Sequence, residues 1–479
     1  MSSTISETLA ALAERSNVRF GTSGVRGLVA DLSPAVCRAY AQAFLSLLGE
    51  SRGEVLIGMD LRPSSPRIAE ACAAELRAHG FTPVNAGVLP TPALAFAALS
   101  SRVPAIMVTG SHIPFDRNGI KFYLPGGEIT KADEARMLSH AITPTEDAPA
   151  TLPPPDAGVA ALYVQRYLEA FRPGALTGMK LGVYEHSSAA RDLLHVILRG
   201  LGAETVSLGR SDSFVPIDTE AVRAEDRALA KGWSQAHGLD AILTTDGDAD
   251  RPLLADEHGD WLRGDVLGIL AAQALGAQTV VTPVSSTTAL EKAGLPHIVR
   301  TRIGSPHVIA GMESARHAPI VGFEANGGFL LGSDVDLNGR NLAALPTRDS
   351  LLPMLLALGI ARAANVPLSQ LVAALPARFS FSDRLQNVDV PACRALLGSL
   401  AEDGATFAAL VGPAPGALTA LDLTDGVRGV FASGDILHLR LSGNAPELRC
   451  YTEAESPQRA EDLCHALLQR VHQRLGTGA

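Results

Sequence analysis

The chain has 479 residues, of which 47% are hydrophobic and 19% are charged, values typical of a globular protein with substantial cores. Its length predicts several domains. The net charge of −10 argues against a broad cationic surface, so neither nucleic acid nor an anionic membrane is expected as a partner.

The cysteines and the N-terminal segment predict a cytoplasmic chain. Five scattered cysteines without a CxxC pair favour reduced thiols over a disulfide framework or a zinc site. The N-terminal segment contains Glu7 and Glu14 and no long apolar core, so no signal peptide is expected. The most apolar stretch, residues 266–281, is interrupted by Gln273, Gly276 and Gln278. It predicts a helix followed by a strand, and no membrane span.

A unit of strand, paired serines, helix and strand occurs three times along the chain. The copies span residues 55–87, 180–209 and 279–304. In each copy a Ser-Ser pair precedes the expected helix, which predicts Ser64, Ser187 and Ser285 as N-caps. Three such units predict three α/β domains of similar build.

The chain beyond these units has a different pattern. A proline-rich stretch at 143–158 predicts a linker. After Ala373 alternating strands predominate, and a helix is expected from Pro457 to about Leu475. We therefore predict an α/β fold with three similar α/β domains containing mixed sheets, and a smaller C-terminal α+β domain. The predicted domains are residues 1–155, 156–260, 261–374 and 375–479.

Ser111 lies in the stretch VTGSHIPFDRNGIK, directly after an expected buried strand at 105–108. A proline and an Asn-Gly pair force a loop there, and the end of a strand in an α/β sheet is where ligands bind. A serine needs a neighbouring base or cation to react, and His112 and Lys121 are candidates. On the residues alone, Ser111 is either a nucleophile or an ordinary turn residue.

Three aspartates at alternate positions, Asp246, Asp248 and Asp250, follow the next strongly apolar strand. Because carboxylates this close repel one another, they predict a site for a hard divalent cation such as Mg²⁺. A solvated acidic turn is the alternative. With Glu257 the aspartates match an EF-hand loop, but Arg251 occupies the position that requires glycine. Strands are also expected on both sides, where an EF-hand has helices.

Two further loops carry groups suited to a sugar phosphate. VGFEANGGFLLGSD (321–334) presents Glu324 and Asn326, whose side chains can hydrogen-bond sugar hydroxyls. A β-turn between two strands explains this stretch equally well. LHLRLSGNAPELRCYTEA (437–454) combines a hydroxyl, an amide, exposed backbone N–H groups and guanidinium groups, a set that predicts a phosphate cradle. The alternative is an ordinary hairpin with charged strands.

In this order, the four loops resemble those of the α-D-phosphohexomutase superfamily over essentially the whole chain. RFGTSGVRG (19–27), GMDLRPSS (58–65) and LPTPAL (89–94) add to the resemblance. It implies four domains around a central cleft and an enzyme that interconverts hexose 1-phosphate and hexose 6-phosphate (mannose and/or glucose). The reaction would pass through a phosphoserine and a bisphosphorylated sugar. The resemblance also implies Mg²⁺ as cofactor, hexose 1,6-bisphosphate as activator and small-molecule sugar phosphates as partners, in a monomer or a dimer.

The resemblance implies roles for individual residues. Ser111 would be the phosphoserine and would hold Mg²⁺ together with Asp246, Asp248 and Asp250. The transferred phosphoryl group would be steadied by Arg26 and Arg251. Proton transfer and charge stabilisation would fall to His112 and Lys121. Sugar hydroxyls would contact Glu324 and Asn326. The other phosphate would be held by Arg440, Ser442, Gly443, Asn444 and Arg449, with Arg302 as a further substrate contact.

Departures from the superfamily's usual motifs leave the sugar open. Ile113 replaces the asparagine of Ser-His-Asn-Pro, the last loop has Gly-Asn-Ala-Pro where many members have Gly-Thr-Glu-Pro, and the sugar loop lacks the usual serine and histidine. Glu-Ala-Asn-Gly-Gly and Gly-Asn-Ala-Pro resemble the mannose- and glucose-phosphate branch more than the glucosamine branch. The alternatives are a phosphoglucosamine mutase, another sugar-phosphate phosphotransferase or phosphatase, and a non-catalytic sugar-phosphate-binding protein.

Overall fold

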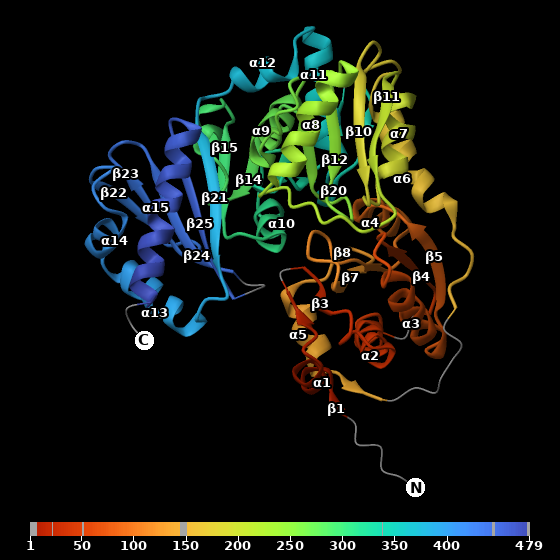
Figure 1. Cartoon of the computed structure of the whole chain (residues 1–479). Helices are drawn as coiled ribbons and strands as arrows, with labels where there is room; N and C mark the ends of the chain where they lie inside the picture. The colour runs from red at the N-terminus through yellow and green to blue at the C-terminus, as the bar shows by residue number, and fades with distance from the viewer. Residues whose placement is uncertain are drawn as a thin grey trace.

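The computed structural model describes residues 7–21, 23–49, 52–143, 151–337, 339–442 and 446–476. Within these ranges four large sheets follow one another along the chain. Figure 1 shows the N-terminal unit, in red and orange, beneath the second and third units, in yellow and green, with the C-terminal unit in blue at one side. The predicted α/β fold with mixed sheets is confirmed.

The first sheet has strand order β2-β3-β7-β6-β4-β5. Its strands are β2 (Arg19–Phe20), β3 (Val25–Leu28), β4 (Glu54–Met59), β5 (Thr82–Val88), β6 (Ala105–Val108) and β7 (Arg117–Leu124), with β8 (Gly127–Glu128) paired to β7. Its helices are α1 (Leu9–Ser16), α2 (Pro34–Leu45), α3 (Ser65–Ala78), α4 (Thr91–Ser101) and α5 (Lys131–Ser139). A separate pair joins β1 (Glu7–Thr8) to β9 (Ala141–Ile142).

The second and third sheets are smaller. The second has order β11-β10-β12-β13, with β10 (Lys180–His186), β11 (Glu204–Arg210), β12 (Ala241–Thr245), β13 (Pro252–Ala255), and helices α6 (Ala157–Ala170), α7 (Arg191–Gly200) and α8 (Ala224–His237). The third has order β15-β14-β16-β17-β20, with β14 (Thr279–Pro283), β15 (His297–Thr301), β16 (Ile320–Phe323), β17 (Phe329–Leu331) and β20 (Leu345–Asp349). Its other elements are α9 (Gly264–Ala274), the 3₁₀ helix η1 (Thr288–Lys292), α10 (Ser305–Glu313), α11 (Leu351–Ala364), α12 (Leu368–Ala373) and the pair β18 (Val335–Asp336) with β19 (Asn341–Leu342).

The fourth sheet is antiparallel throughout, with order β21-β25-β24-β23-β22. Its strands are β21 (Phe379–Gln386), β22 (Leu418–Asp422), β23 (Val427–Phe431), β24 (Ile436–Leu441) and β25 (Glu447–Ala454), and its helices are α13 (Val390–Glu402), α14 (Gly404–Val411) and α15 (Pro457–Gly476). The expected C-terminal helix is therefore present.

The three predicted repeats fold as strand–helix–strand units with one shared topology. In each, a central strand (β4, β10 or β14) pairs in parallel with two neighbours, and the second of these pairs antiparallel with the next strand along the chain. The β-branched runs form the buried central strands because parallel strands have both faces covered.

The hydrophobic cores separate the C-terminal unit from the rest. One large core extends from Leu56 to Leu368 and contains residues of all three repeats, whereas the fourth sheet has its own core, from Cys393 to Val471. This separation is what a distinct C-terminal unit needs. The domain boundaries given above remain predictions.

The prediction that Ser64, Ser187 and Ser285 cap the following helices is wrong. Ser64 precedes α3, but its side chain caps no backbone N–H and instead accepts a hydrogen bond from Asn118 Nδ2 at 2.8 Å. The N-cap of α7 is Ala190 and that of η1 is Thr287, so Ser187 and Ser285 are not caps either. Serine is favoured at caps, but tertiary partners compete for its hydroxyl.

Candidate active site

Ser111 lies on the loop between β6 and β7, buried to 1% exposure. Its backbone is in the left-handed region (φ 53°), an uncommon conformation for a residue other than glycine. The N–H of Ser111 donates to Thr109 Oγ1 at 2.8 Å. Such strained positions persist only where the surroundings hold them and concentrate at functional sites.

Arg62 holds the Ser111 loop in place by hydrogen bonds to its backbone. Its side chain is buried and donates to four carbonyl oxygens, at 2.5–2.9 Å, those of Ser111, Ile113, Pro114 and Arg117. The guanidinium also lies 3.9 Å from the ring centroid of Phe214, on the segment after β11. Asp60, whose Oδ2 lies 3.2 Å from Arg62 Nε, accepts from Thr109 Oγ1 at 2.8 Å. Both residues lie in the GMDLRPSS stretch, to which sequence reasoning assigned no role.

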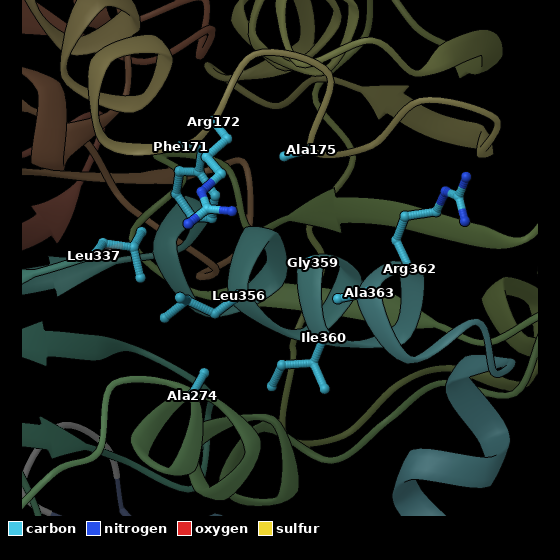
Figure 2. A pocket seen from close by; sticks show the side chains of 10 residues that line it. All are labelled: Phe171, Arg172, Ala175, Ala274, Leu337, Leu356, Gly359, Ile360, Arg362 and Ala363. Atoms are coloured by element: carbon cyan, nitrogen blue, oxygen red, sulfur yellow. The ribbon is translucent and has the colours of Figure 1, made fainter. Parts of the chain in front are cut away.

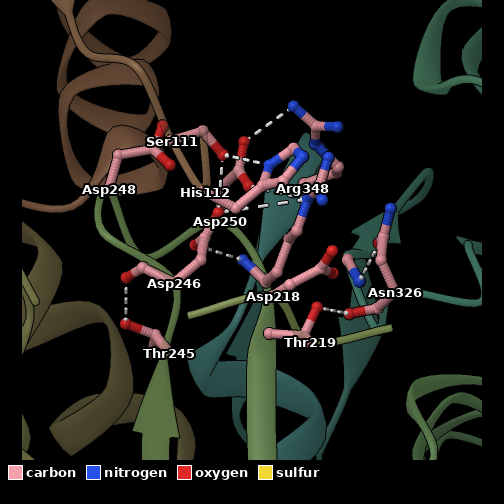
Figure 3. A network of polar contacts seen from close by, with 12 residues as sticks. Ser111, His112, Asp218, Thr219, Thr245, Asp246, Asp248, Asp250, Asn326 and Arg348 are labelled. Carbon is pink, nitrogen blue, oxygen red and sulfur yellow. Dashed lines mark hydrogen bonds and ion pairs between the residues drawn. The ribbon is translucent and has the colours of Figure 1, made fainter. Parts of the chain in front are cut away.

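The three predicted aspartates converge on Ser111 (Figure 3). They lie on the turn between β12 and β13, are fully buried, and present ligand oxygens within 4.8 Å of one another. Ser111 Oγ donates to Asp246 Oδ2 at 2.6 Å. The flanking elements are strands, as predicted, and not the helices of an EF-hand.

Asp248 and Asp250 each have one carboxylate oxygen, Oδ2, that is bound by neighbouring side chains. Lys121 Nζ lies 2.7 Å from Asp248 Oδ2 and 2.8 Å from Asp250 Oδ2, and Thr91 Oγ1 donates to Asp248 Oδ2 at 2.6 Å. Arg348 Nη2 donates to Asp250 Oδ2 at 2.7 Å. Thr91 belongs to the LPTPAL stretch, whereas nothing in the sequence around Arg348 marked it.

The remaining oxygens suit a bound cation. Asp248 Oδ1 and Asp250 Oδ1 are buried without a hydrogen-bond partner, and such atoms are costly unless a ligand satisfies them. Burial, Asp248 and Asp250 raise the pKa of Asp246 well above its ordinary value. Buried oxygen ligands of this kind are what Mg²⁺ prefers. The triad can therefore hold a metal ion.

His112 contacts the same serine, and the charge of Arg26 acts on His112. His112 Nδ1 lies 3.3 Å from Ser111 Oγ. Burial, together with Arg251 and Arg26, lowers the pKa of His112 well below its ordinary value, so its imidazole is neutral near pH 7. Burial and the charge of Arg251 lower the pKa of Arg26, on β3, to about 10. Arg251 Nε lies 3.7 Å from Asp250 Oδ1.

The predicted sugar loop is the turn between β16 and β17. Glu324 is 4% exposed, and its Oε2 lies 3.5 Å from Arg348 Nη1. Asn326 Oδ1 accepts the N–H of Gly328 at 2.9 Å, and the Asn326 carbonyl accepts Thr219 Oγ1 at 2.7 Å. The asparagine thus shapes the turn, which the sequence alone did not indicate.

The predicted phosphate clamp lies between β24 and β25, on the fourth sheet. Arg440 Nε is 3.5 Å from Asp425 Oδ1, and Arg302 Nε donates to the Thr424 carbonyl at 3.1 Å, so both arginines meet one turn. Arg449 Nη1 lies 3.8 Å from Glu220 of the second unit. The backbone N–H of Ser442 donates to the Glu447 carbonyl at 2.9 Å. Gly443 and Asn444 lie outside the described residues.

A separate cavity of about 340 Å³ opens between α6, α9 and α11 (Figure 2). It is lined by Phe171, Arg172, Ala175, Ala274, Leu337, Leu356, Gly359, Ile360, Arg362 and Ala363. Arg172 and Arg362 lie near the C-terminal ends of α6 and α11, where cations complement the helix dipole. Arg362 Nε is already bonded to the Thr177 carbonyl, at 2.6 Å. These residues include no carboxylate or imidazole to ligate a metal.

Comparisons with known proteins identify the class to which this protein belongs. Phosphoglucomutase/phosphomannomutase family models match three segments: the model of alpha/beta/alpha domain I matches residues 17–147, that of domain III matches 263–379 and that of the C-terminal domain matches 365–470. The matched segments cover more than half of the chain, which therefore belongs to the phosphoglucomutase/phosphomannomutase family.

Relatives narrow the reaction to that of a phosphohexomutase, an isomerase that moves a phosphoryl group within a sugar. The chain is 47% identical to a phosphomannomutase of Salmonella muenchen, over 96% of this chain and 97% of the relative. It is 31% identical to a phosphoglucosamine mutase of Symbiobacterium thermophilum, over 74% of this chain and 80% of the relative. A phosphoglucomutase/phosphomannomutase family protein of Burkholderia thailandensis shares the fold, with a TM-score of 0.72 at 23% identity, over 95% and 96% of the two chains. No helix within the described ranges combines the length and apolar character needed to cross a membrane.

Proposed function

We propose that this phosphohexomutase interconverts the 1- and 6-phosphates of mannose and/or glucose through phospho-Ser111. The observation that carries the proposal is the 2.6 Å contact between Ser111 Oγ and Asp246 within the buried aspartate triad. A serine in this position is next to a cation site and a neutral imidazole, the two aids that a phosphoryl-transfer nucleophile needs.

Mg²⁺ fits this donor set and would be held by Asp246, Asp248, Asp250 and the phosphate of Ser111. It would supply charge neutralisation at the phosphoryl oxygens. The chain supplies the rest. Arg26 and Arg251 bind the phosphoryl oxygens and align them, and Lys121 balances the charge of Asp248 and Asp250.

In the first transfer, a sugar hydroxyl oxygen forms a bond to phosphorus while the bond from phosphorus to Ser111 Oγ breaks. The hydroxyl proton passes to His112, whose imidazole is neutral near pH 7. Ser111 Oγ leaves with the electron pair and takes up that proton from His112, whose Nδ1 lies 3.3 Å from it. The product is a hexose 1,6-bisphosphate, which also explains why this compound would activate an unphosphorylated enzyme.

The second transfer requires the bisphosphate to turn round in the site. Its other phosphate then faces Ser111, and the phosphate just formed occupies the distal clamp of Arg440, Ser442, Gly443, Asn444 and Arg449, with Arg302 beside it. Glu324 and Asn326 bind the sugar hydroxyls in both orientations. Water must be kept out during the turn, because it would hydrolyse phospho-Ser111.

The choice of sugar is supported by the relatives. Identity to phosphomannomutases reaches 47% and 45% across almost the whole chain, against 31% for a phosphoglucosamine mutase. We therefore expect conversion of mannose and glucose phosphates to exceed that of glucosamine phosphate.

The test assays the 1-phosphates of mannose, glucose and glucosamine in parallel, with Mg²⁺ and catalytic hexose 1,6-bisphosphate. Ser111→Ala should abolish conversion, whereas Ser399→Ala, on the surface of α13, should not. Retained activity in Ser111→Ala would remove the phosphoserine assignment. Release of inorganic phosphate at the rate of sugar consumption would favour a phosphatase instead, and binding without turnover a non-catalytic protein.

A further inference from the structure

Arg348, on the edge strand β20, contacts two of the functional loops. It is 7% exposed, and its guanidinium donates to Asp250 Oδ2 at 2.7 Å and to Glu324 Oε2 at 3.5 Å. Figure 3 shows it between the aspartate turn and the sugar loop. Asp250 belongs to the second unit and Glu324 to the third, so Arg348 links two loops that are distant in sequence.

The arginine compensates charges that would otherwise repel. Asp250 and Glu324 are both buried carboxylates, and a buried charge without a partner is strongly destabilising. Burial by itself would lower the pKa of Arg348, but Asp250 and Glu324 raise it well above its ordinary value. The planar guanidinium reaches the two carboxylates with two different nitrogens in a fixed geometry, Nη2 toward Asp250 and Nη1 toward Glu324, whereas lysine has a single nitrogen.

The contact also determines which oxygen of Asp250 remains available. Lys121 and Arg348 both hold Oδ2, and Oδ1 is buried without a hydrogen-bond partner. Groups that hold the non-coordinating side of a metal ligand fix its orientation. Arg348 therefore orients Asp250 and Glu324 at the same time.

The absence of a side chain at Gly328, in the sugar loop, leaves room for the Arg348 side chain. A Cβ on Gly328 would lie 2.7 Å from Arg348 Cδ and 2.8 Å from its Cγ. Real Cβ atoms do not approach so closely. The second glycine of the Glu-Ala-Asn-Gly-Gly stretch is thus the residue over which the arginine passes, an independent indication that the placement is part of the site.

We propose that Arg348 is a positioning residue that ties the sugar loop to the aspartate turn, so that Glu324 is held in place for the sugar hydroxyls through Asp250. The inference rests on the proposed function for the identity of the sugar ligand. It predicts a specific dependence: a change at Asp250 affects sugar binding through Arg348 even when no metal is bound.

The test measures binding without turnover. Ser111→Ala protein is titrated calorimetrically with mannose 6-phosphate in the presence of EDTA, with and without Arg348→Met and Asp250→Asn. Each substitution should weaken binding about tenfold, and the two together no more than either alone, as expected for residues that act as one unit. Asp256→Asn is the matched control. It removes the charge of a buried carboxylate that accepts hydrogen bonds within its own loop and is not bonded to Arg348, and it should not weaken binding.

Two further variants separate positioning from a general loss of structure. Arg348→Lys keeps the charge but replaces the two nitrogens that reach Asp250 and Glu324 by one on a different stem, so it should lose at least fivefold in affinity. Gly328→Ala should displace the arginine and weaken binding, whereas Gly232→Ala, on α8 with open space at its Cβ, should not. Additive losses, an Asp250→Asn effect equal to that of Asp256→Asn, or wild-type affinity in Arg348→Lys would each overturn the proposal. Because none of these readouts needs mutase activity, they succeed or fail separately from the Ser111 assay.

Discussion

Replacing Arg62 by methionine tests how the Ser111 loop is held. Methionine keeps much of the length of the side chain but removes four hydrogen bonds to the loop carbonyls and the ion partner of Asp60. Arg62 is buried behind the loop and is not expected to contact substrate. Its removal should therefore act on the position of Ser111 and not on sugar affinity.

The expected loss of stability follows from these contacts. Removing one partner of a buried ion pair lowers the free energy of unfolding by roughly 3–5 kcal/mol. Asp60 keeps hydrogen bonds from Ser65 Oγ, Thr109 Oγ1 and the Gly110 N–H, so the loss of unfolding free energy should be near the lower end, about 3 kcal/mol.

The expected effect on the rate follows from the position of Ser111. A displacement of the proposed nucleophile by about 1 Å is enough to lower the rate about 100-fold. We expect kcat to fall by about that factor, with KM nearly unchanged.

The assay combines steady-state kinetics with hydrogen exchange of residues 109–119. In Arg62→Met the amides of this loop should exchange faster. Arg67→Met is the control, because Arg67 also donates to backbone carbonyls, those of Leu32 and Val29, but away from the loop. Adding Asp60→Asn to Arg62→Met should recover stability without recovering kcat, since the unpaired charge is gone but the loop is still unsupported. A kcat within threefold of wild type despite faster exchange would refute the reasoning.

Three more predictions concern the metal, pH and packing. Asp248→Asn should weaken Mg²⁺ binding at least tenfold in calorimetry, whereas Asp256→Asn, a buried carboxylate bonded within its own loop, should not. Burial lowers the pKa of His438 to about 4, below the unfolded value near 6.5. The folded chain then binds fewer protons, and His438 should contribute a loss of roughly 2 kcal/mol in unfolding free energy between pH 7.5 and pH 5. Urea titrations should show a smaller loss for His438→Gln. In Gly119→Ala the new Cβ would lie 2.3 Å from a backbone oxygen of the neighbouring strand, so solubility and thermal midpoint should fall; Gly126→Ala, with open space, should match wild type.

The sequence was sufficient to predict those site residues that are marked by their immediate neighbours in the chain. Ser111 and the aspartate triad each follow a short, strongly apolar strand, and such strands are recognisable without tertiary information. Once β6 and β12 are placed correctly, the loops that follow must lie at the ends of their sheets. The contact between Ser111 and Asp246 then depends only on how the units associate, which the motifs of the resemblance already implied.

The supporting residues could not be found in this way. Arginine is usually a surface residue, so the sequence does not mark Arg62 and Arg348 as buried. Both are buried because they bond to residues far along the chain, such as Ser111 for Arg62 and Asp250 for Arg348. A buried arginine is rare unless paired, and the pairing is visible only in three dimensions. The Ser-Ser caps failed for the same reason, because Asn118, distant in sequence, takes the hydroxyl of Ser64.

The position of the loops explains why one chain can build this site from repeated units. Ser111 lies between β6 and β7, the aspartates between β12 and β13, and Glu324 between β16 and β17. In every case the loop joins the second parallel neighbour of the central strand to its antiparallel partner. The proposed nucleophile, the proposed metal ligands and the proposed sugar contact therefore occupy equivalent positions in three copies of one unit. Since such a loop can vary while its strands keep the core, divergence of the copies supplies three different chemical groups without changing the scaffold, and Arg348 joins two of these loops.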